Sequence, residues 1–194
     1  NAIVLGDMNI TGNADIDAGG LLTATSVTTN ASGTIDLDTS SGGIIATFVV
    51  SADTASITAA AGDITLGSVT AAGAVDITAT LGSINDATTD LVVADVSGSA
   101  ITLIAATGIG STQALEFVDS ASVNASVTGT GNINLQGLGA LTLGNANTAA
   151  GSITVGAAGL LTATSVTTNA SGIIDLDTSS GGIIATFVVS ADTA

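Results

Sequence analysis

Apolar and polar residues alternate in short units along this chain, and a glycine usually precedes each unit. Clear examples are Gly62–Leu66, Gly131–Leu135 and Gly151–Val155, in which two apolar residues flank a Thr or an Asn. Strict alternation over four to six residues is typical of β-strands with one buried face. No stretch carries the apolar stripe of an amphipathic helix, so the pattern predicts an all-β protein without helices.

A second, longer rhythm joins these units. Equivalent apolar residues recur about 20 residues apart, as Ile64 and Ile84 do, and as Ile133, Ile153 and Ile174 do. One coil of a parallel β-solenoid has about this length, and stacked coils bury residues that no coil could bury alone. The spacing predicts a β-solenoid (parallel β-helix) of about 20 residues per coil and about 9–10 coils, with residues 1–194 as one continuous segment.

The longest regularity is a tandem repeat. Gly20–Ala55 recurs as Gly159–Ala194 with one difference, Thr34 in the first copy and Ile173 in the second. The offset of 139 residues predicts a repeat of about seven coils. The second copy ends in an apolar strand region without a polar cap, so we expect the chain to continue or copies to stack end to end. Leu91–Gln113 is the least regular stretch, although no clear insertion is evident.

Composition narrows the chemistry that this chain can perform. Lys, Arg, His, Cys, Pro, Trp and Tyr are absent, the formal charge is −16, and 46% of the residues are hydrophobic. Without cations, nucleic-acid binding is not expected, and without His or Cys there is no Ser-His or Cys-His nucleophile system and no conventional zinc site. No apolar run is long enough to span a bilayer. The chain is therefore predicted not to be an enzyme, and Phe48, Phe117 and Phe187 are expected to be buried stacking residues.

Two pairs of acidic residues form the candidate metal site. In Asp15-Ile16-Asp17 and Asp36-Leu37-Asp38 the carboxylates point outward, and the two pairs are separated by the length of one coil. Asp15, Asp17, Asp36 and Asp38 would then stack into one patch of carboxylates that repel one another. A hard cation such as Ca²⁺ would relieve this repulsion. Apart from Ca²⁺ here, no cofactor is predicted.

Other interpretations of these features remain open. The four carboxylates can equally form a solvated acidic face, and the second copy does not reproduce the cluster, because Asp175 and Asp177 lie one coil after Thr154 and Gly156. Outward threonines could bind ice, but no coil-by-coil Thr-x-Thr array occurs. Paired aspartates could cleave glycosidic bonds, but that idea rests on analogy between folds alone.

The glycine-led strand units, joined by stretches such as Leu143–Gly151 and Gly159–Asn169, resemble the repeat regions of filamentous-haemagglutinin-like adhesins, which are very large secreted bacterial surface proteins. The resemblance implies a right-handed parallel β-helix, an extracellular or cell-surface location, and a role as fibre or adhesin shaft. Family members usually begin with a secretion domain, which nothing here matches. Expected partners are other copies of the chain, end to end and laterally, and a host or neighbouring cell surface. The alternative is a binding module of an adhesin that recognises a glycan or a host receptor.

Overall fold

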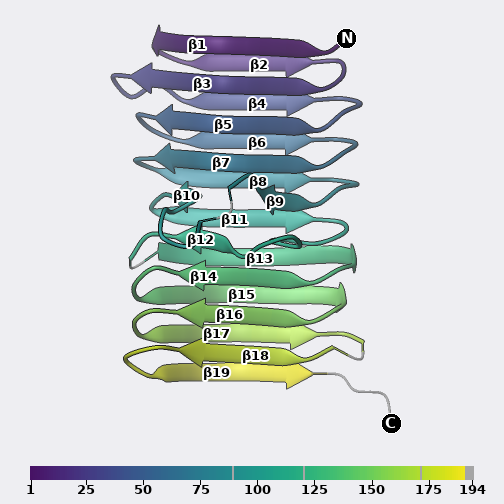
Figure 1. Ribbon diagram of the computed structural model, residues 1–194, viewed down its shortest axis with the longest axis vertical. Helices are drawn as coiled ribbons and strands as arrows, with labels where there is room; N and C mark the ends of the chain where they lie inside the picture. Colours follow the sequence, from purple (N-terminus) through teal and green to yellow (C-terminus); the bar gives the residue numbers. More distant parts are fainter. Residues whose placement is uncertain (89, 120, 171, 191–194) are drawn as a thin grey trace.

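The computed structural model describes residues 1–88, 90–119, 121–170 and 172–190, and in these ranges it consists of strands, turns and loops without a helix. The strands form two parallel sheets that face each other, and the chain passes from one sheet to the other twice in every turn (Figure 1). The predicted all-β solenoid is confirmed, with about nine turns and about 20 residues per turn.

Consecutive strands alternate between the sheets, except for β9 and β10, which both belong to the first sheet. The first sheet contains β1 (Ile3–Thr11), β3 (Leu22–Asn30), β5 (Ile44–Ser51), β7 (Ile64–Ala71), β9 (Ile84–Asp86), β10 (Val96–Ser97), β12 (Leu115–Phe117), β14 (Ile133–Gly137), β16 (Ile153–Ala157) and β18 (Ile174–Thr178). The second sheet contains β2 (Ala14–Ala18), β4 (Ile35–Thr39), β6 (Ala55–Ala59), β8 (Ala74–Ala79), β11 (Ala100–Ala105), β13 (Ala121–Thr130), β15 (Leu141–Ala150), β17 (Leu161–Thr168) and β19 (Ile183–Ser190).

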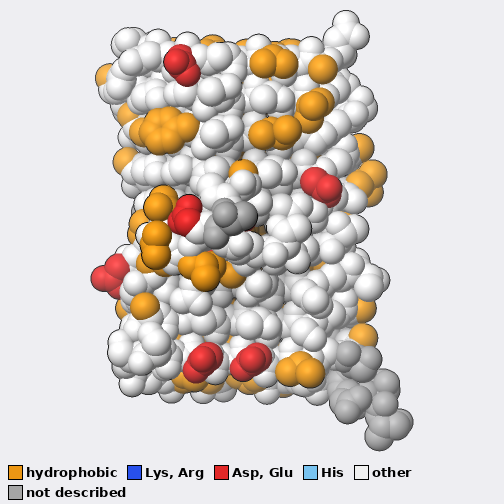
Figure 2. All heavy atoms as spheres, viewed as in Figure 1, with side chains coloured by type: hydrophobic (Ala, Val, Ile, Leu, Met, Phe, Trp, Pro, Cys, Tyr) orange, Lys and Arg blue, Asp and Glu red, His pale blue; other side chains and the backbone are white. Residues whose placement is uncertain are grey.

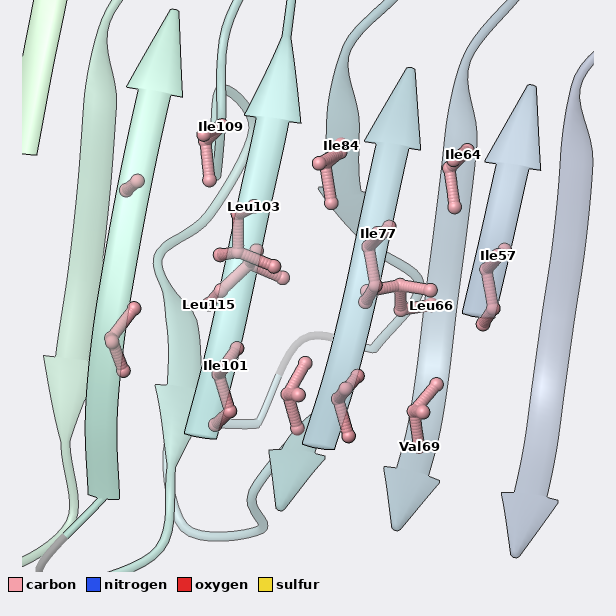
Figure 3. Packing of buried hydrophobic residues seen from close by; sticks show 14 of the residues in the cluster. Ile57, Ile64, Leu66, Val69, Ile77, Ile84, Ile101, Leu103, Ile109 and Leu115 are labelled. Carbon is pink, nitrogen blue, oxygen red and sulfur yellow. The ribbon is translucent and has the colours of Figure 1, made fainter. Parts of the chain in front are cut away.

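The core is a column of apolar side chains between the two sheets. In the first sheet Ile44 pairs with Ile64 and Ile64 with Ile84, so similar side chains stack from turn to turn. Figure 3 shows Ile64, Leu66 and Ile84 from one sheet directed toward Ile57 and Ile77 from the other. All five side chains are fully buried. Each such burial contributes about 1.5–3 kcal/mol to folding, so adding turns adds stability.

Hydroxyl groups satisfy the backbone where the chain turns between sheets. The buried Thr29 Oγ1 donates a hydrogen bond of 2.8 Å to the Gly33 carbonyl, and Thr148 Oγ1 donates one of 2.8 Å to the Gly131 carbonyl. At Gly33 a Cβ would collide with the carbonyl of Gly12 in the preceding turn. Buried threonine and glycine at these corners therefore let successive turns approach closely without leaving carbonyls unpaired.

The middle of the chain departs from this regular winding. The steps along the first sheet from Leu22 to Ile84 keep the usual spacing of about 20 residues, whereas those from Ile84 to Ile109 and from Ile109 to Ile133 are longer. The extra residues form a loop at 87–95, of which the structure describes 87–88 and 90–95, between β9 and β10, and a second loop at 110–114, before β12. We call Ile84–Phe117 the junction. It overlaps Leu91–Gln113, the stretch expected to be irregular, and it contains an insertion that was not evident in the sequence.

The long strands lie in different sheets on the two sides of the junction. Before it, the strands of eight or nine residues (β1, β3, β5, β7) lie in the first sheet and those of five or six (β2, β4, β6, β8) in the second. After it, the strands of eight to ten residues (β13, β15, β17, β19) lie in the second sheet. The two copies of Leu22–Asn30 therefore occupy opposite sheets.

The tandem repeat consequently does not span a whole number of turns. Six steps of the first sheet lead from Leu22 to Ile153, and the equivalent of Leu22 in the second copy, Leu161, lies half a turn beyond, in the second sheet. The repeat thus makes six and a half turns. The predicted seven turns are corrected, because the two long turns of the junction raise the average length of a turn.

The last described turn has no turn stacked beyond it. Leu37 and Val49 are fully buried in the first copy, whereas Leu176 is only half-buried and Val188 is 44% exposed in the second. Residues 191–194, the end of the second copy, lie outside the described residues. The open turn therefore presents core-facing side chains and the free edges of β18 and β19 to solvent.

The aromatic residues only partly match expectation. Phe117 is fully buried in the junction, but Phe48 and Phe187 are 45% and 54% exposed, so the expectation of burial was wrong for both (Figure 2 shows apolar side chains reaching the surface). Phe48 pairs with Ser68, immediately before the buried pair Val49 and Val69. The strict alternation breaks at this point, because two consecutive residues, of which Phe48 is the second, are exposed on β5.

Candidate functional site

The four aspartates predicted as a metal site lie side by side on neighbouring turns. Asp15 on β2 pairs with Asp36 on β4, and Asp17 pairs with Asp38. The predicted register is confirmed. Burial raises the pKa of Asp38 above its ordinary value, followed by the charge of Asp36, while a hydrogen bond with Thr58 lowers it and the charges of Asp17 and Asp15 raise it further. These carboxylates therefore repel one another as expected.

Geometry distinguishes this quartet from a closed site. A shallow hollow beside it is lined by Asp17 and Asp38 but not by the other two aspartates. Asp15 and Asp17 are exposed, and Asp36 and Asp38 are half-buried. In the second copy Asp175 pairs with Thr154 and Asp177 with Gly156, so the quartet is not reproduced there, as the spacing predicted. Binding of Ca²⁺ by Asp15, Asp17, Asp36 and Asp38 stays a prediction.

The structure brings a different set of acids together inside the junction. Asp86 ends β9, Asp95 precedes β10, and Glu116 lies in the middle of β12. Each offers a carboxylate oxygen, and these oxygens all lie within 4.8 Å of one another. The side chains are 7%, 1% and 0% exposed, respectively. We call these three residues the acid triad.

The inserted loop explains why these acids are buried. Glu116 lies between Leu115 and Phe117, which are both core residues, so alternation places its side chain on the other face of β12. The end of the 87–95 loop is fixed there by two hydrogen bonds. The Asp95 N–H donates to the Glu116 carbonyl at 3.0 Å, and the Glu116 N–H donates to Asp95 Oδ2 at 2.9 Å.

Asp86 is held from the start of the same loop. Its Oδ1 accepts hydrogen bonds from the Thr88 N–H at 2.7 Å and from Thr88 Oγ1 at 2.9 Å. Asp86 pairs with Leu66, so it occupies a position that an apolar residue fills in the preceding turn. The loop therefore begins and ends at triad residues.

Several triad oxygens lack a hydrogen-bond donor. Asp86 Oδ2 and both carboxylate oxygens of Glu116 are buried and have no hydrogen-bond partner among the described residues. Leaving a buried polar group unsatisfied costs about 1–3 kcal/mol, and more when it is charged. No Lys, Arg or His exists in the sequence to neutralise the triad.

The protonation of the triad follows from its burial. Burial raises the pKa of Asp95 to about 9; the Glu116 N–H, which donates to its carboxylate, lowers this pKa, and the charges of Asp86 and Glu116 raise it further. Burial also raises the pKa of Glu116, helped by the charges of Asp86 and Asp90. Three adjacent carboxylates without a cation therefore do not all ionise near neutral pH.

Sequence reasoning missed this cluster, although a signal was present. Asp95 and Glu116 are separated by the length of one coil, the same spacing that correctly placed Asp15 beside Asp36. Glu116 is also the only glutamate of the chain, and it lies between two large apolar residues. What the pattern could not show is the cover that the 87–95 loop places over Glu116.

The acid triad offers carboxylate oxygens as ligands. The triad can share protons or hold a hard cation, but it is closed to substrate-sized molecules because its side chains are buried. The described part of the chain has no helix long and apolar enough to cross a membrane. Comparison of the chain with models of protein families, with curated proteins and with solved structures found no match.

Proposed function

We propose that this chain is a shaft segment of a large extracellular or cell-surface fibre or adhesin, and that its role is structural rather than enzymatic. Its stiffness would come from two continuous ladders of backbone hydrogen bonds around a dry core. The resemblance of its repeats to filamentous-haemagglutinin-like adhesins is in keeping with this role, and the parallel β-solenoid agrees with the fold that the resemblance implies.

The observation that carries the proposal is the stacking of like apolar residues in register from turn to turn, as in Ile44, Ile64 and Ile84. Ile44 is fully buried in the first copy, whereas its equivalent Ile183 is 43% exposed on the open last turn. The first copy also has a defined next turn, because Ile35 on β4 pairs with Ala55 on β6. A turn with the sequence that follows the first copy would fit on β18 in the same way and extend the rod.

The proposed location rests on composition. A chain without Lys and Arg has no cleavage site for trypsin-like proteases, and it lacks the cations that bind nucleic acid. Its outward positions carry mainly Thr, Ser, Asn and Asp, as a fibre exposed to solvent requires. Surface labelling of intact source cells with an antibody against the chain tests this location, and staining seen only after permeabilisation would argue against it.

Extension of the chain is the main test of the shaft. Appending residues 56–194 after Ala194 adds one further copy of the whole repeat. We expect cryo-electron microscopy to show one straight rod that is longer by about 31 Å, the height of six and a half turns spaced about 4.8 Å apart. Two separate particles joined by a linker would contradict the shaft.

A matched pair of variants tests assembly of separate copies. Ile174 packs against the core on the open last turn, whereas Ile173 beside it is 72% exposed. If copies stack end to end, filaments should grow with concentration, and Ile174→Asp should shorten them much more than Ile173→Asp, which introduces the same charge. Equal effects of the two substitutions would exclude stacking through the core-facing edge.

One observation favours the alternative role as a binding module. The inserted loop exposes Leu91, Val92 and Val93 by 59%, 78% and 56%, and a hollow of about 380 Å³ beside it is lined by Leu91, Val92 and Leu138, among others. Because its lining has no aromatic residue, the hollow suits an apolar protein surface better than a glycan. Val92→Asp should then abolish attachment to receptor-bearing cells, while Val4→Asp, at another exposed valine, should not.

A further inference from the structure

We propose that Asp86, Asp95 and Glu116 bind one Ca²⁺ ion, which fixes the inserted loop against β12 and locks the two halves of the solenoid together at the junction. This site is distinct from the aspartate quartet on β2 and β4. It would give the rod a calcium-dependent joint at the place where its winding changes phase.

The arrangement of the oxygens suits a calcium ion. Ca²⁺ binds its oxygen ligands at about 2.3–2.6 Å, so two ligands on opposite sides of the ion are at most about 5 Å apart. The triad oxygens all lie within 4.8 Å of one another, which places them within the reach of a single ion. Three carboxylates supply up to six oxygens, and Ca²⁺ accepts six to eight in flexible geometry.

The unpartnered oxygens favour a cation over a shared proton. A proton between Asp95 and Glu116 would supply a donor to one Glu116 oxygen at most, and the other Glu116 oxygen and Asp86 Oδ2 would stay unsatisfied. One cation placed among the three side chains satisfies all of these atoms at once. It also removes most of the charge that burial would otherwise make costly.

The position of the site gives the ion a mechanical role. Asp86 and Asp95 bracket the loop, and Glu116 belongs to β12, which pairs with β14 of the second half of the rod. The loop is joined to β12 by the bond from the Asp95 N–H to the Glu116 carbonyl and the bond from the Glu116 N–H to Asp95 Oδ2, and to the residues before β12 by a 2.7 Å bond from Gln113 Nε2 to the Asp90 carbonyl. With an ion, the two ends of the loop and β12 share one ligand sphere.

Titration calorimetry with CaCl₂ on the full chain, stripped of metal by a chelator, tests the proposal. We expect one high-affinity ion per chain and release of protons on binding at pH 7, measured as a dependence of the heat on buffer ionisation. Glu116→Gln should weaken binding by about 100-fold, the upper end of the loss caused by removing a residue that only supports a metal ligand. Asp95→Asn, a second variant, should act in the same direction.

Two control variants separate this site from general attraction to an acidic protein. Asp76→Asn removes an exposed charge on β8, outside the junction, and should leave the affinity unchanged. Replacing Asp15, Asp17, Asp36 and Asp38 together by Asn removes the quartet and should also leave the high-affinity ion in place. Loss of that ion in the quartet variant, or its survival in Glu116→Gln, would overturn the proposal, as would the absence of any high-affinity binding.

Hydrogen exchange gives a readout that does not depend on binding heats. Addition of CaCl₂ should slow amide exchange in residues 86–96 and 115–117 of the wild-type chain and leave turns far from the junction unchanged. Glu116→Gln should abolish this protection while circular dichroism shows that the solenoid remains folded. Protection spread evenly over all turns would point to nonspecific screening and would contradict a defined site.

Discussion

The two copies of the 36-residue stretch share all but one residue, yet they differ in burial and in the sheets they occupy. In the first copy β3 and β5 lie in the first sheet and their core-facing residues are buried. In the second copy the same strands, β17 and β19, lie in the second sheet, and every residue of β19 is exposed. Local sequence thus specifies a strand and its inward positions, whereas neighbouring turns determine its burial.

The largest difference in stability between the two copies is expected when the same side chain is removed from each. Leu37→Ala empties a fully buried position, so it should lower the free energy of unfolding by about 2–5 kcal/mol. Leu176→Ala acts at the half-buried equivalent on the open turn and should cost less than about 1 kcal/mol. Urea denaturation measures both, and equal losses would show that the last turn is covered in solution.

Extension of the rod should remove that difference. In the chain lengthened by residues 56–194, a further turn covers β18, so Leu176→Ala should become about as costly as Leu37→Ala, again about 2–5 kcal/mol. The lengthened chain without the substitution serves as the reference. If Leu176→Ala stays mild there, the added repeat does not stack on the open turn.

The junction should differ from the regular turns in its response to pH. In the absence of metal, Asp95 keeps its proton in the folded state up to about pH 9, but it loses that proton near its ordinary pKa of 3.8 when unfolded. The folded state therefore binds more protons between these values, and stability should fall as the pH rises through this window. Asp95→Asn should flatten the decline in chelator-treated protein, and an unchanged slope would contradict this assignment.

The smallest effect is expected where the two copies differ in sequence. Ile173 is 72% exposed, and Thr34 occupies the equivalent position in the first copy. Ile173→Thr makes the copies identical and should change the free energy of unfolding by less than about 0.5 kcal/mol, as surface substitutions usually do. A clear loss of stability would reveal a contact of Ile173 with another molecule, for example in an assembled filament.

Local patterns predicted the regular part of this fold. Each turn repeats a buried apolar pair such as Ile64 and Leu66, and a spacing of about 20 residues places like residues in register. The same rhythm placed Asp15 beside Asp36 from the sequence alone. These features depend on neighbours that lie one turn away, which is why periodicity alone captures them.

The remaining features depend on contacts that do not recur from turn to turn, so the periodicity of the sequence does not predict them. Glu116 resembles an outward residue of a strand until the 87–95 loop covers it. Phe48 faces outward because alternation breaks within β5. The half-turn shift follows from the lengths of two irregular turns, and a count of residues does not reveal in which sheet the chain emerges from them.

Because the repeat makes six and a half turns, equivalent surface residues of successive blocks would lie on opposite sheets of a longer rod. Ile45 and Phe48 are exposed on the first sheet, and their equivalents Ile184 and Phe187 are exposed on the second. In a tandem array, identical surface groups would point in opposite directions from one block to the next, and the exterior would recur only after two blocks, or about 62 Å at about 4.8 Å per turn. Such a rod would present the same exposed apolar groups, Ile45 and Phe48 among them, on both of its flanks.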